Sequence, residues 1–475
     1  MTSGSGGGSR HVLPGRGLPV DLRVHLIGIG GAGMSALAWI LLQRGHRVTG
    51  SDLRAGRAVT ALRAMGAEIE IGQQPATVDG SDLVVASGAI PAGDPELRRA
   101  IELGLPVLRR AQLLARLMDG HARVLVAGTH GKTTTTSMAT VCLQTGGLDP
   151  SFAIGGTLHD AGTSAHHGSG RWFVAEADES DPAFLEYEPD VATVTNVIAD
   201  PHEAPVGAVA ADEAFLAFIG ARRDGGVAVL NLDDPGSRRL LARSAAPVST
   251  YGVHPDATLR IVGTELHPEG ARFGLIHRGE DVGRFEISLP GTHNIANAAA
   301  AALTSAHAGV DWDGIRRGLS IFAGASRRFE RLGTAAGVTV VDDYGYHPTE
   351  LRATLAAARQ TAPGGRVIAV FQPHRFSRTA ALGAQLGAAL VDADAVIVTD
   401  VYGAGEQPVA GVTGELVAGA AMDAGVETHY VASVADVPAR LLNLAEPGDL
   451  VLTLGAGDIT EVGPVVLERL RGGRG

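Results

Sequence analysis

The segment around Lys132 carries the clearest chemical signal in the sequence. Only one of the 39 basic residues is a lysine, and it lies in Gly128-Thr-His-Gly-Lys-Thr-Thr134, after an apolar run and before a helical pattern. Backbone N–H groups of such a loop wrap phosphate oxygens, the lysine reaches the β- and γ-phosphates, and the hydroxyl of Thr133 binds Mg²⁺. Val126 stands where the full Walker A spacing has glycine. We predict a phosphate-binding loop, with an ordinary glycine turn as the alternative.

A second glycine-rich segment, Gly28-Ile-Gly-Gly-Ala-Gly33, follows the apolar run 23–27. Its G-x-G-x-x-G spacing, with Asp52 at the end of the next predicted strand, is typical of loops that bring backbone and a helix N-terminus close to a diphosphate. Taken alone, this motif favours a dinucleotide-dependent oxidoreductase. The alternative is a tight strand-to-helix turn without a ligand.

An acidic run, Glu176-Ala-Asp-Glu-Ser-Asp181, follows the apolar segment 172–175. Carboxylates at the carboxyl end of a strand, next to a phosphate loop, are natural Mg²⁺ ligands. The run therefore predicts a metal site, with a solvated acidic loop as the alternative.

Four later segments combine amide, histidine and arginine side chains. Gly291-Thr-His-Asn-Ile-Ala-Asn297 opens an alanine-rich stretch, where its amides either bind a base or cap a helix. Arginine pairs suit carboxylate or phosphate recognition, or form surface salt bridges. The other three segments are Ser326-Arg-Arg-Phe-Glu330, Asp342-Asp-Tyr-Gly-Tyr-His-Pro348 and Phe371-Gln-Pro-His-Arg-Phe-Ser-Arg378.

The elements that must position these segments are short apolar runs alternating with helical patterns, which predicts parallel sheets covered by helices. The predicted strands are 23–27, 47–49, 83–86, 107–108, 123–127, 172–175, 191–194, 227–230, 339–341, 367–370, 395–398 and 450–453. The predicted helices are 34–44, 133–144, 293–308, 349–360, 377–391, 413–424 and 433–444. Segment 259–289 has close-spaced short runs with glycine turns, so we expect an antiparallel insertion there.

Length and composition narrow the class of protein. The 475 residues suit three α/β domains, which we expect at 21–120, 121–325 and 326–475 after a disordered tail at 1–20. A net charge of −12 argues against nucleic acid as the main partner. The single cysteine, Cys142, argues against a disulfide framework and is expected to be a small buried hydrophobe. With neither a long apolar span nor a signal peptide, we expect a cytoplasmic protein.

The motifs together resemble the Mur ligase family. They run in family order from residue 23 to about residue 460. The matching residues are Ile27 to Ser35, Gly128 to Thr134, Glu176 to Asp181, His293, Asn294, Asn297, Arg327 to Glu330, Asp342 to Tyr344, His347 to Glu350, Phe371 to Arg375, Asp400 to Tyr402 and Gly455 to Asp458.

The resemblance implies a three-domain α/β fold: a Rossmann-like N-terminal UDP-substrate domain, a central P-loop ATPase-type domain and a C-terminal Rossmann-like amino-acid domain. It implies an ATP-dependent amide ligase of peptidoglycan precursor synthesis that joins L-alanine to UDP-N-acetylmuramate through an acyl phosphate. Its implied cofactors are ATP and Mg²⁺, and its partners are a UDP-sugar carboxylate and an amino acid. We expect a monomer or a weak homodimer.

The resemblance also implies roles for residues. Lys132, Glu176 and His347 are the expected catalytic residues, and Thr133, Glu176 and His202 are the expected metal ligands. The nucleotide-binding set is Gly128, Thr129, His130, Gly131, Lys132, Thr133, Thr134, Asn294, Asn297, Arg328 and Asp343. The substrate-binding set is Gly30, Gly31, Met34, Ser51, Asp52, Ser87, Tyr346, His374, Arg375 and Arg378. The loop at 28–33 is then expected to hold a UDP diphosphate, which replaces the oxidoreductase interpretation.

Four positions depart from the family pattern, and one of them is Pro205, which lies in the region of a tyrosine. Ile198 replaces a glutamate, and Pro201 stands at the position of a metal-binding histidine, with His202 next to it. Tyr346 replaces a histidine that faces the amino-acid pocket in the family. Three alternatives follow: a Mur-like ligase of specialised metabolism that joins another carboxylate and amine, a nucleotide-binding pseudoenzyme, and an NAD-dependent dehydrogenase, which leaves Lys132 and everything beyond residue 120 unexplained.

Overall fold

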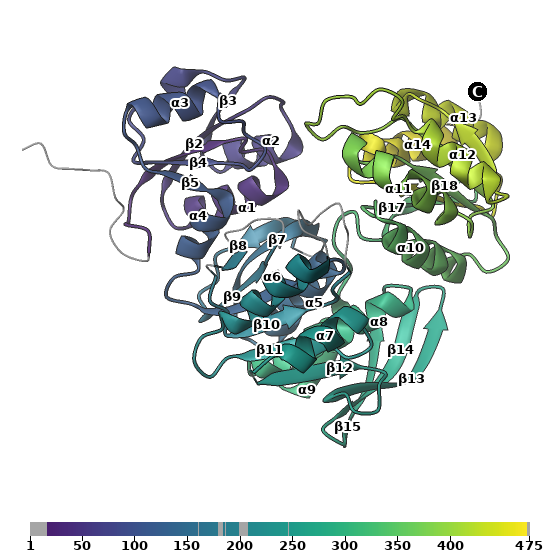
Figure 1. The fold of residues 1–475 in the computed structure, drawn as a ribbon, viewed down its shortest axis with the longest axis horizontal. Helices are drawn as coiled ribbons and strands as arrows, with labels where there is room; N and C mark the ends of the chain where they lie inside the picture. The colour runs from purple at the N-terminus through teal and green to yellow at the C-terminus, as the bar shows by residue number, and fades with distance from the viewer. Residues whose placement is uncertain are drawn as a thin grey trace, which may run out of the picture.

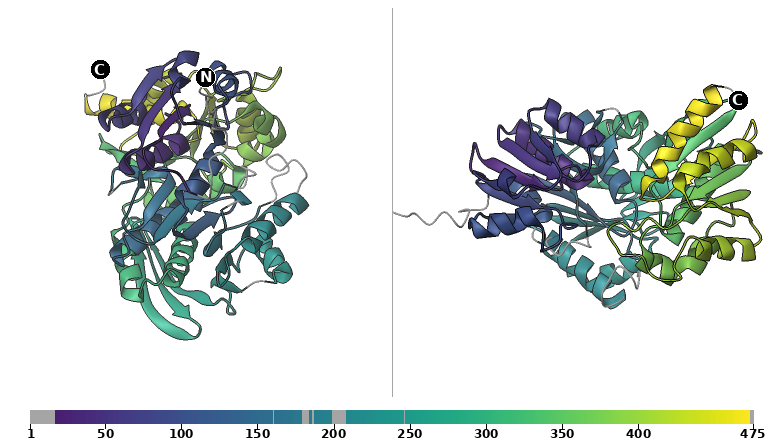
Figure 2. Two further views of the ribbon diagram at one scale, coloured as in Figure 1. Left: turned by 90° about the vertical axis from the view of Figure 1, so that its left-hand side faces the viewer. Right: turned by 90° about the horizontal axis from the view of Figure 1, so that it is seen from above.

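Three separate β-sheets divide the chain, each covered by helices. The computed structural model describes residues 17–159, 161–178, 184–185, 187–198, 208–245 and 247–472. The first sheet has five strands, the second ten and the third six. The first and third domains lie side by side above the central domain, as Figures 1 and 2 show. The domain boundaries that we propose near residues 120 and 325 fall between the sheets.

The N-terminal domain is a doubly wound parallel sheet of strand order β3-β2-β1-β4-β5. Its core strands, such as β1 and β4, are buried along most of their length because helices cover both faces. The strands are β1 (Arg23–Ile27), β2 (Arg47–Asp52), β3 (Glu68–Ile71), β4 (Leu83–Ala86) and β5 (Val107–Arg109). The helices are α1 (Ala32–Gln43), α2 (Arg57–Ala64), α3 (Pro95–Glu102) and α4 (Arg110–Leu117), with a 3-10 turn η1 (Pro75–Val78).

The central domain has the order β15-β14-β13-β12-β11-β10-β6-β9-β7-β8. The predicted antiparallel insertion is confirmed as β13 to β15, which extend a sheet that is parallel around β6. The strands are β6 (Ala122–Ala127), β7 (Ser151–Leu158), β8 (Thr163–His166), β9 (Trp172–Glu176), β10 (Val191–Val194), β11 (Val227–Asn231), β12 (Val248–Gly252), β13 (Leu259–His267), β14 (Gly270–His277) and β15 (Glu280–Ile287). The helices are α5 (Lys132–Thr145), α6 (Ala208–Gly220), α7 (Pro235–Arg243), α8 (Thr292–His307) and α9 (Trp312–Ile321).

The central sheet separates two hydrophobic cores. Successive strand residues point to opposite faces, so Val124 packs with α5, α8 and α9, while Leu125 packs toward Phe215 and Phe218 of α6. The second of these cores is continuous with the core of the N-terminal domain. Cys142 is fully buried in α5, as expected for a small hydrophobe.

The C-terminal domain has the order β16-β17-β21-β18-β19-β20, antiparallel only at β16. Its strands are β16 (Glu330–Ala335), β17 (Val338–Asp343), β18 (Val367–Phe371), β19 (Ala395–Val398), β20 (Glu427–Tyr430) and β21 (Leu450–Leu454). Its helices are α10 (Pro348–Thr361), α11 (Phe376–Ala388), α12 (Glu415–Asp423), α13 (Val437–Leu444) and α14 (Val462–Arg471), with 3-10 turns η3 (Val434–Asp436) and η4 (Asp458–Glu461). Among the described residues, no helix is long and apolar enough to cross a membrane.

Candidate active site

The phosphate loop connects β6 to α5, and two of its glycines have positive φ, at +130° for Gly128 and +80° for Gly131. The neighbouring strand β10 continues into Thr195 and Asn196, which hold the loop. The hydroxyl of Thr195 and the amide of Asn196 donate to the carbonyl of His130 at 2.5 and 3.0 Å. The ammonium of Lys132 donates to the Gly128 carbonyl at 2.6 Å, so it lies inside the loop. The loop between β6 and α5 is therefore held in place by the end of β10.

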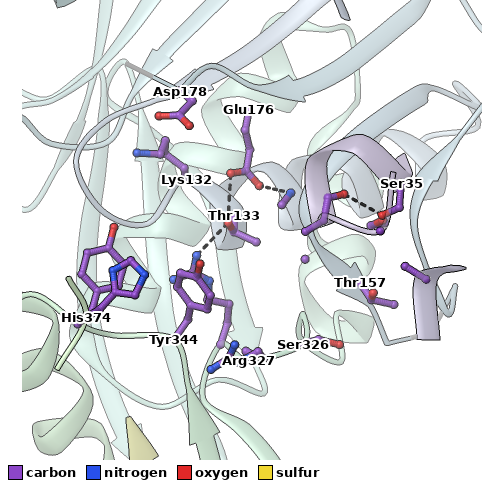
Figure 3. A pocket seen from close by; sticks show the side chains of 18 of the residues that line it. Ser35, Lys132, Thr133, Thr157, Glu176, Asp178, Ser326, Arg327, Tyr344 and His374 are labelled. Atoms are coloured by element: carbon purple, nitrogen blue, oxygen red, sulfur yellow. Dashed lines mark hydrogen bonds between the residues drawn. The ribbon is translucent and has the colours of Figure 1, made fainter. Parts of the chain in front are cut away.

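Thr133 and Glu176 form the oxygen cluster expected of a metal site. The Thr133 hydroxyl donates to Oε2 of Glu176 at 3.2 Å, and the Gly155 amide donates to Oε1 at 2.6 Å (Figure 3). A hydroxyl and a carboxylate are ligands that Mg²⁺ prefers, with phosphate oxygens and water completing its shell. This pair fits one Mg²⁺, although the described residues contain no group of three His, Cys, Asp or Glu side chains that could hold a metal. His202 and Pro201 lie outside the described residues.

A cavity of about 1120 Å³ joins the three domains at this point. Figure 3 shows Lys132, Thr133, Glu176 and Asp178 on one side of it, with Arg327, Tyr344 and His374 across from them. The N-terminal domain contributes Gly30, Ala32, Ser35, Trp39 and Arg57 among others. Asp178 also makes an ion pair with Arg110 of α4 at 3.7 Å, which ties the N-terminal domain to the metal side of the cavity.

In the N-terminal domain, the loop after β1 is built around a carboxylate. Asp52 accepts the Gly30 amide at 2.8 Å, and a Cβ atom on Gly30 would lie only 2.8 Å from that same carboxylate oxygen. Of the residues predicted to bind substrate in this domain, Gly30 lines the large cavity. Met34 and Ser51 are buried, and Ser51 donates to Glu96 at 2.5 Å inside the domain. Gly31, Asp52 and Ser87 surround the loop without lining the cavity.

The C-terminal domain contributes an arginine and aromatic wall. The Arg378 guanidinium lies 4.4 Å from the ring centre of Tyr346 and donates to Nδ1 of His374 at 3.0 Å. Burial, together with Arg378 and Arg375, lowers the pKa of His374 to about 4, so the ring is neutral at pH 7 and its Nδ1 can accept. All four residues predicted here, Tyr346, His374, Arg375 and Arg378, line the cavity. This wall presents positive charge suited to a carboxylate.

A second cavity, of about 340 Å³, lies on the other side of the phosphate loop. It is lined by Asn294, Asn297, Arg328 and Asp343, all four predicted to bind a nucleotide. Burial raises the pKa of Asp343, although its carboxylate accepts the backbone N–H groups of Phe329 and Gly345, each at 2.8 Å. The two cavities share Ile198 and Arg328 in their walls. Ile198 thus places an apolar side chain in the wall between the two cavities.

Tyr344 and Glu350 stand in family motifs of the sequence, but no role is predicted for either of them from the sequence. The guanidinium groups of Arg327 and Arg328 lie 4.9 and 5.0 Å from the ring centre of Tyr344. Glu350 lies 2.9 Å from Nδ1 of His130, across the boundary between domains. Besides the family motif, its position three residues after His347, as in a helix capping box, was a signal in the sequence. The expected catalytic residue His347 caps α10 and lies with its ring 5.0 Å from that of His130.

The fold and the site define a three-domain enzyme in which the loop of Lys132, the Thr133–Glu176 pair and a wall of arginine and aromatic side chains line one cavity. Three family models match: "Mur ligase family, catalytic domain" over residues 23–122, "Mur ligase middle domain" over 126–305 and "Mur ligase, glutamate ligase domain" over 327–457. The chain belongs to the Mur ligase family.

Individual relatives cover nearly the whole chain. A UDP-N-acetylmuramate–L-alanine ligase from Mycobacterium sp. (strain JLS) is 48% identical over 469 residues, 96% of each chain. One from Streptomyces avermitilis is 46% identical over 459 residues, 96% of this chain and 99% of that protein. Among solved structures, UDP-N-acetylmuramate-alanine ligase from Thermotoga maritima has a TM-score of 0.82 at 25% identity, covering 95% of this chain and all of that one. A murein peptide ligase from Psychrobacter arcticus shares the fold, with a TM-score of 0.73 at 24% identity, covering 95% and 99%.

Proposed function

We propose that this ligase joins L-alanine to the carboxylate of UDP-N-acetylmuramate with cleavage of ATP to ADP and phosphate, a step of peptidoglycan precursor synthesis. The observation that carries the proposal is the single cavity in which Lys132, Glu176, Tyr346 and Arg378 meet, because this reaction needs a phosphate site and a carboxylate site within reach of each other. The relatives that match over 96% of the chain bear the name of this activity.

In the proposed first step, a carboxylate oxygen of the sugar attacks the γ-phosphorus of ATP, the bond to the bridging oxygen of ADP breaks, and an acyl phosphate forms. Lys132 and the loop amides offset the charge that moves onto the bridging and γ-phosphate oxygens. Thr133 and Glu176 are the residues that would hold Mg²⁺, which supplies further charge neutralisation when bound.

In the second step, the amine nitrogen of alanine attacks the acyl carbon and gives a tetrahedral intermediate. The C–O bond to phosphate then breaks, the nitrogen loses its proton, and an amide and inorganic phosphate leave. The wall of Tyr346, His374, Arg375 and Arg378 receives the alanine carboxylate in this proposal. His347 begins α10 and supports the loop that carries Tyr346.

The other predicted binding residues receive the remaining parts of the two nucleotide substrates in this proposal. The second cavity, with Asn294, Asn297 and Asp343, takes the adenosine part of ATP. The loop of Gly30 and Gly31 takes the UDP diphosphate, with Asp52 fixing its backbone.

Because ATP and UDP-sugars are cytoplasmic metabolites, we place the reaction in the cytoplasm. We expect a monomer or a weak homodimer, which sedimentation over a range of protein concentrations tests.

The decisive experiment measures phosphate release with ATP, Mg²⁺ and UDP-N-acetylmuramate while the amino acid is varied. Release that depends on L-alanine supports the proposal. Release only with another amine or another carboxylate supports a divergent ligase, which Tyr346 and Ile198 favour as the second candidate, since both stand in the cavity wall where the family has other side chains. Nucleotide binding with no release under any pairing contradicts both and identifies a pseudoenzyme.

A further inference from the structure

Glu350 is a buried carboxylate whose two oxygens have different partners. Its Oε1 lies 2.9 Å from Nδ1 of His130 in the phosphate loop, and both side chains are only about one sixth exposed. Its Oε2 accepts the backbone N–H groups of Tyr346 and His347 at 3.0 and 3.2 Å. One carboxylate therefore connects the phosphate loop of the central domain with the C-terminal loop that carries Tyr346.

The charge of Glu350 is maintained despite its burial. Burial alone would raise the pKa of this carboxyl, but the charge and hydrogen bond of His130, together with Arg328, hold it well below its usual range. Because a carboxylate only accepts hydrogen bonds, Nδ1 of His130 carries the proton of their contact. The pair thus fixes which imidazole nitrogen faces Glu350, and with it the orientation of the ring.

The other imidazole nitrogen, Nε2 of His130, is buried and has no hydrogen-bond partner among the residues that the structure describes. Buried polar atoms are nearly always paired, so such an atom indicates a missing partner. His130 lines the second cavity beside Gly131, Thr134 and Asn297. The partner of Nε2 is therefore expected to come from what that cavity holds.

We propose that His130 and Glu350 form a positioning pair that couples the two halves of the site: Glu350 orients His130 so that its Nε2 binds a nucleoside triphosphate, and also holds the Tyr346 loop of the amine side. The inference rests on the proposed function for the identity of the amine. It assigns Glu350, which touches neither reacting group, a role in both nucleotide and amine binding.

Different substitutions separate the effect of the pair on nucleotide binding, the nucleotide arm, from its effect on amine binding, the amine arm. In His130→Asn, the side-chain amide takes the place of Nδ1 and keeps a donor for Glu350, but nothing replaces Nε2. Glu350→Gln removes the charge that orients His130 and weakens the acceptor for the Tyr346 loop. The double variant tests coupling, because contributions of groups that act through one another are not additive.

The nucleotide arm is measured as the Kd of the non-hydrolysable analogue AMP-PNP with Mg²⁺, by calorimetric titration of the full-length protein. We expect His130→Asn to raise this Kd about tenfold, as for loss of a hydrogen bond to a charged group. Glu350→Gln should raise the Kd of AMP-PNP by a similar factor. The Kd of the double variant should be no higher than the higher of the two single-variant values. An unchanged Kd in His130→Asn, or a double variant equal to the product of both single effects, overturns the proposal.

The amine arm is measured as the KM for L-alanine at saturating ATP and UDP-N-acetylmuramate. Glu350→Gln is expected to raise this KM, whereas His130→Asn leaves it unchanged, a split that general destabilisation would not produce. Equal KM values in all variants would overturn the coupling. If Glu350→Gln does not fold, the Kd of His130→Asn still decides the nucleotide arm.

A matched control exists in the same interface. His159 of the central domain makes an ion pair of the same kind with Glu330 of the C-terminal domain, at 3.2 Å. His159→Gln should leave the Kd of AMP-PNP and the KM for L-alanine unchanged, because neither residue contacts the phosphate loop. If the wild type releases no phosphate with L-alanine, the proposed function is contradicted. The AMP-PNP titrations still test the His130–Glu350 pair, so failure of one proposal can be distinguished from failure of the other.

Discussion

Lys132 depends on the shape of its side chain as much as on its charge. Its ammonium lies within the loop, 2.6 Å from the Gly128 carbonyl and 3.5 Å from the Thr129 carbonyl. A compact ammonium donates in any direction, whereas a guanidinium is planar and needs a wider site. This difference explains why a sequence that otherwise uses arginine has a lysine at this position.

For Lys132→Arg we therefore expect loss of turnover by at least about a hundredfold, a size typical of removing one group that stabilises transition-state charge. Steady-state phosphate release gives the rate, and the thermal unfolding midpoint reports whether the fold is kept. Activity close to that of the wild type would show that Lys132 does not contact the transferred phosphate.

Tyr346 packs against Arg378 in the wall of the large cavity. Its ring lies 4.4 Å from the Arg378 guanidinium, a cation–π contact typically worth about 1 kcal/mol. We expect Tyr346→Leu to raise the KM for L-alanine about fivefold, the equivalent of that energy, because Arg378 loses its support. Tyr346→Phe keeps the ring and serves as the control. If both variants have the same KM, the aromatic face does not position Arg378.

At the scale of elements, the site is assembled where parallel strands end. The loops that follow β1, β6, β9, β17 and β18 carry the glycine, phosphate-loop, acidic and arginine segments. Parallel strands bring their carboxyl ends to one edge, and the helix that follows directs its N-terminal amides there. The turn from β6 into α5 has little room, since a Cβ atom on Gly131 would lie 2.5 Å from Oδ1 of Asn297.

Gly131→Ala tests that close approach. The residue has φ +80°, which costs a non-glycine residue about 1 kcal/mol, and the clash displaces Asn297 from the second cavity. We expect a lower unfolding free energy together with much weaker AMP-PNP binding, measured by urea unfolding and calorimetry. Gly147→Ala is the matched control, because Gly147 has φ +74° with nothing within 4 Å of its Cβ position. It should lose stability but keep nucleotide affinity, and equal losses of affinity in both variants would contradict the role of the clash.

At the scale of the whole molecule, the three domains meet at contacts that also serve the site. The ion pair of Arg110 with Asp178 joins the N-terminal domain to the central one. The contact of His130 with Glu350 joins the central domain to the C-terminal one. Gln360 of α10 adds hydrogen bonds to the carbonyls of His267 and Gly270 in the antiparallel insertion. The domains are therefore joined partly by groups that line the site and partly by contacts outside it, including the hydrophobic core that the first two domains share.

The unfolding free energy should decrease as the pH is lowered, because the fold keeps two histidines neutral. Burial lowers the pKa of His293 to about 4, and that of His374 to a similar value, both below the ordinary 6.5. As pH falls through 6.5, the unfolded chain binds protons that the folded protein does not, so the unfolding free energy decreases between pH 6.5 and 4. At pH 5.5 each histidine should contribute a loss of about 1 kcal/mol relative to pH 7.

The check is the urea unfolding free energy at pH 7 and 5.5 for wild type and His293→Asn. The variant should lose less stability between these two pH values, whatever its absolute stability. His254→Asn, at a histidine whose side chain is 40% exposed, is the control. The same pH dependence in wild type and His293→Asn would show that His293 is not held neutral by the fold.

The sequence predicted the local structure where apolar patterning is strong. The strand predicted at 123–127 is β6, the helix at 349–360 is α10 within one residue at each end, and the insertion at 259–289 is antiparallel. The prediction missed the edge strands β3, β8, β16 and β20, and also β7 and β12 inside the central sheet. Edge strands are partly exposed, so they lack the continuous apolar run that reveals a buried parallel strand.

The sequence by itself determined the chemistry available to this protein: a phosphate loop around Lys132, an acidic partner in Glu176 and arginines for a carboxylate, because these depend on residue type and short spacing. Only the tertiary structure decided which side chains face the cavities. Met34 and Ser51 turn into the interior, while Glu350, far from His130 in sequence, reaches the phosphate loop. Such contacts depend on how sheets and domains pack, and packing joins residues that no local pattern relates.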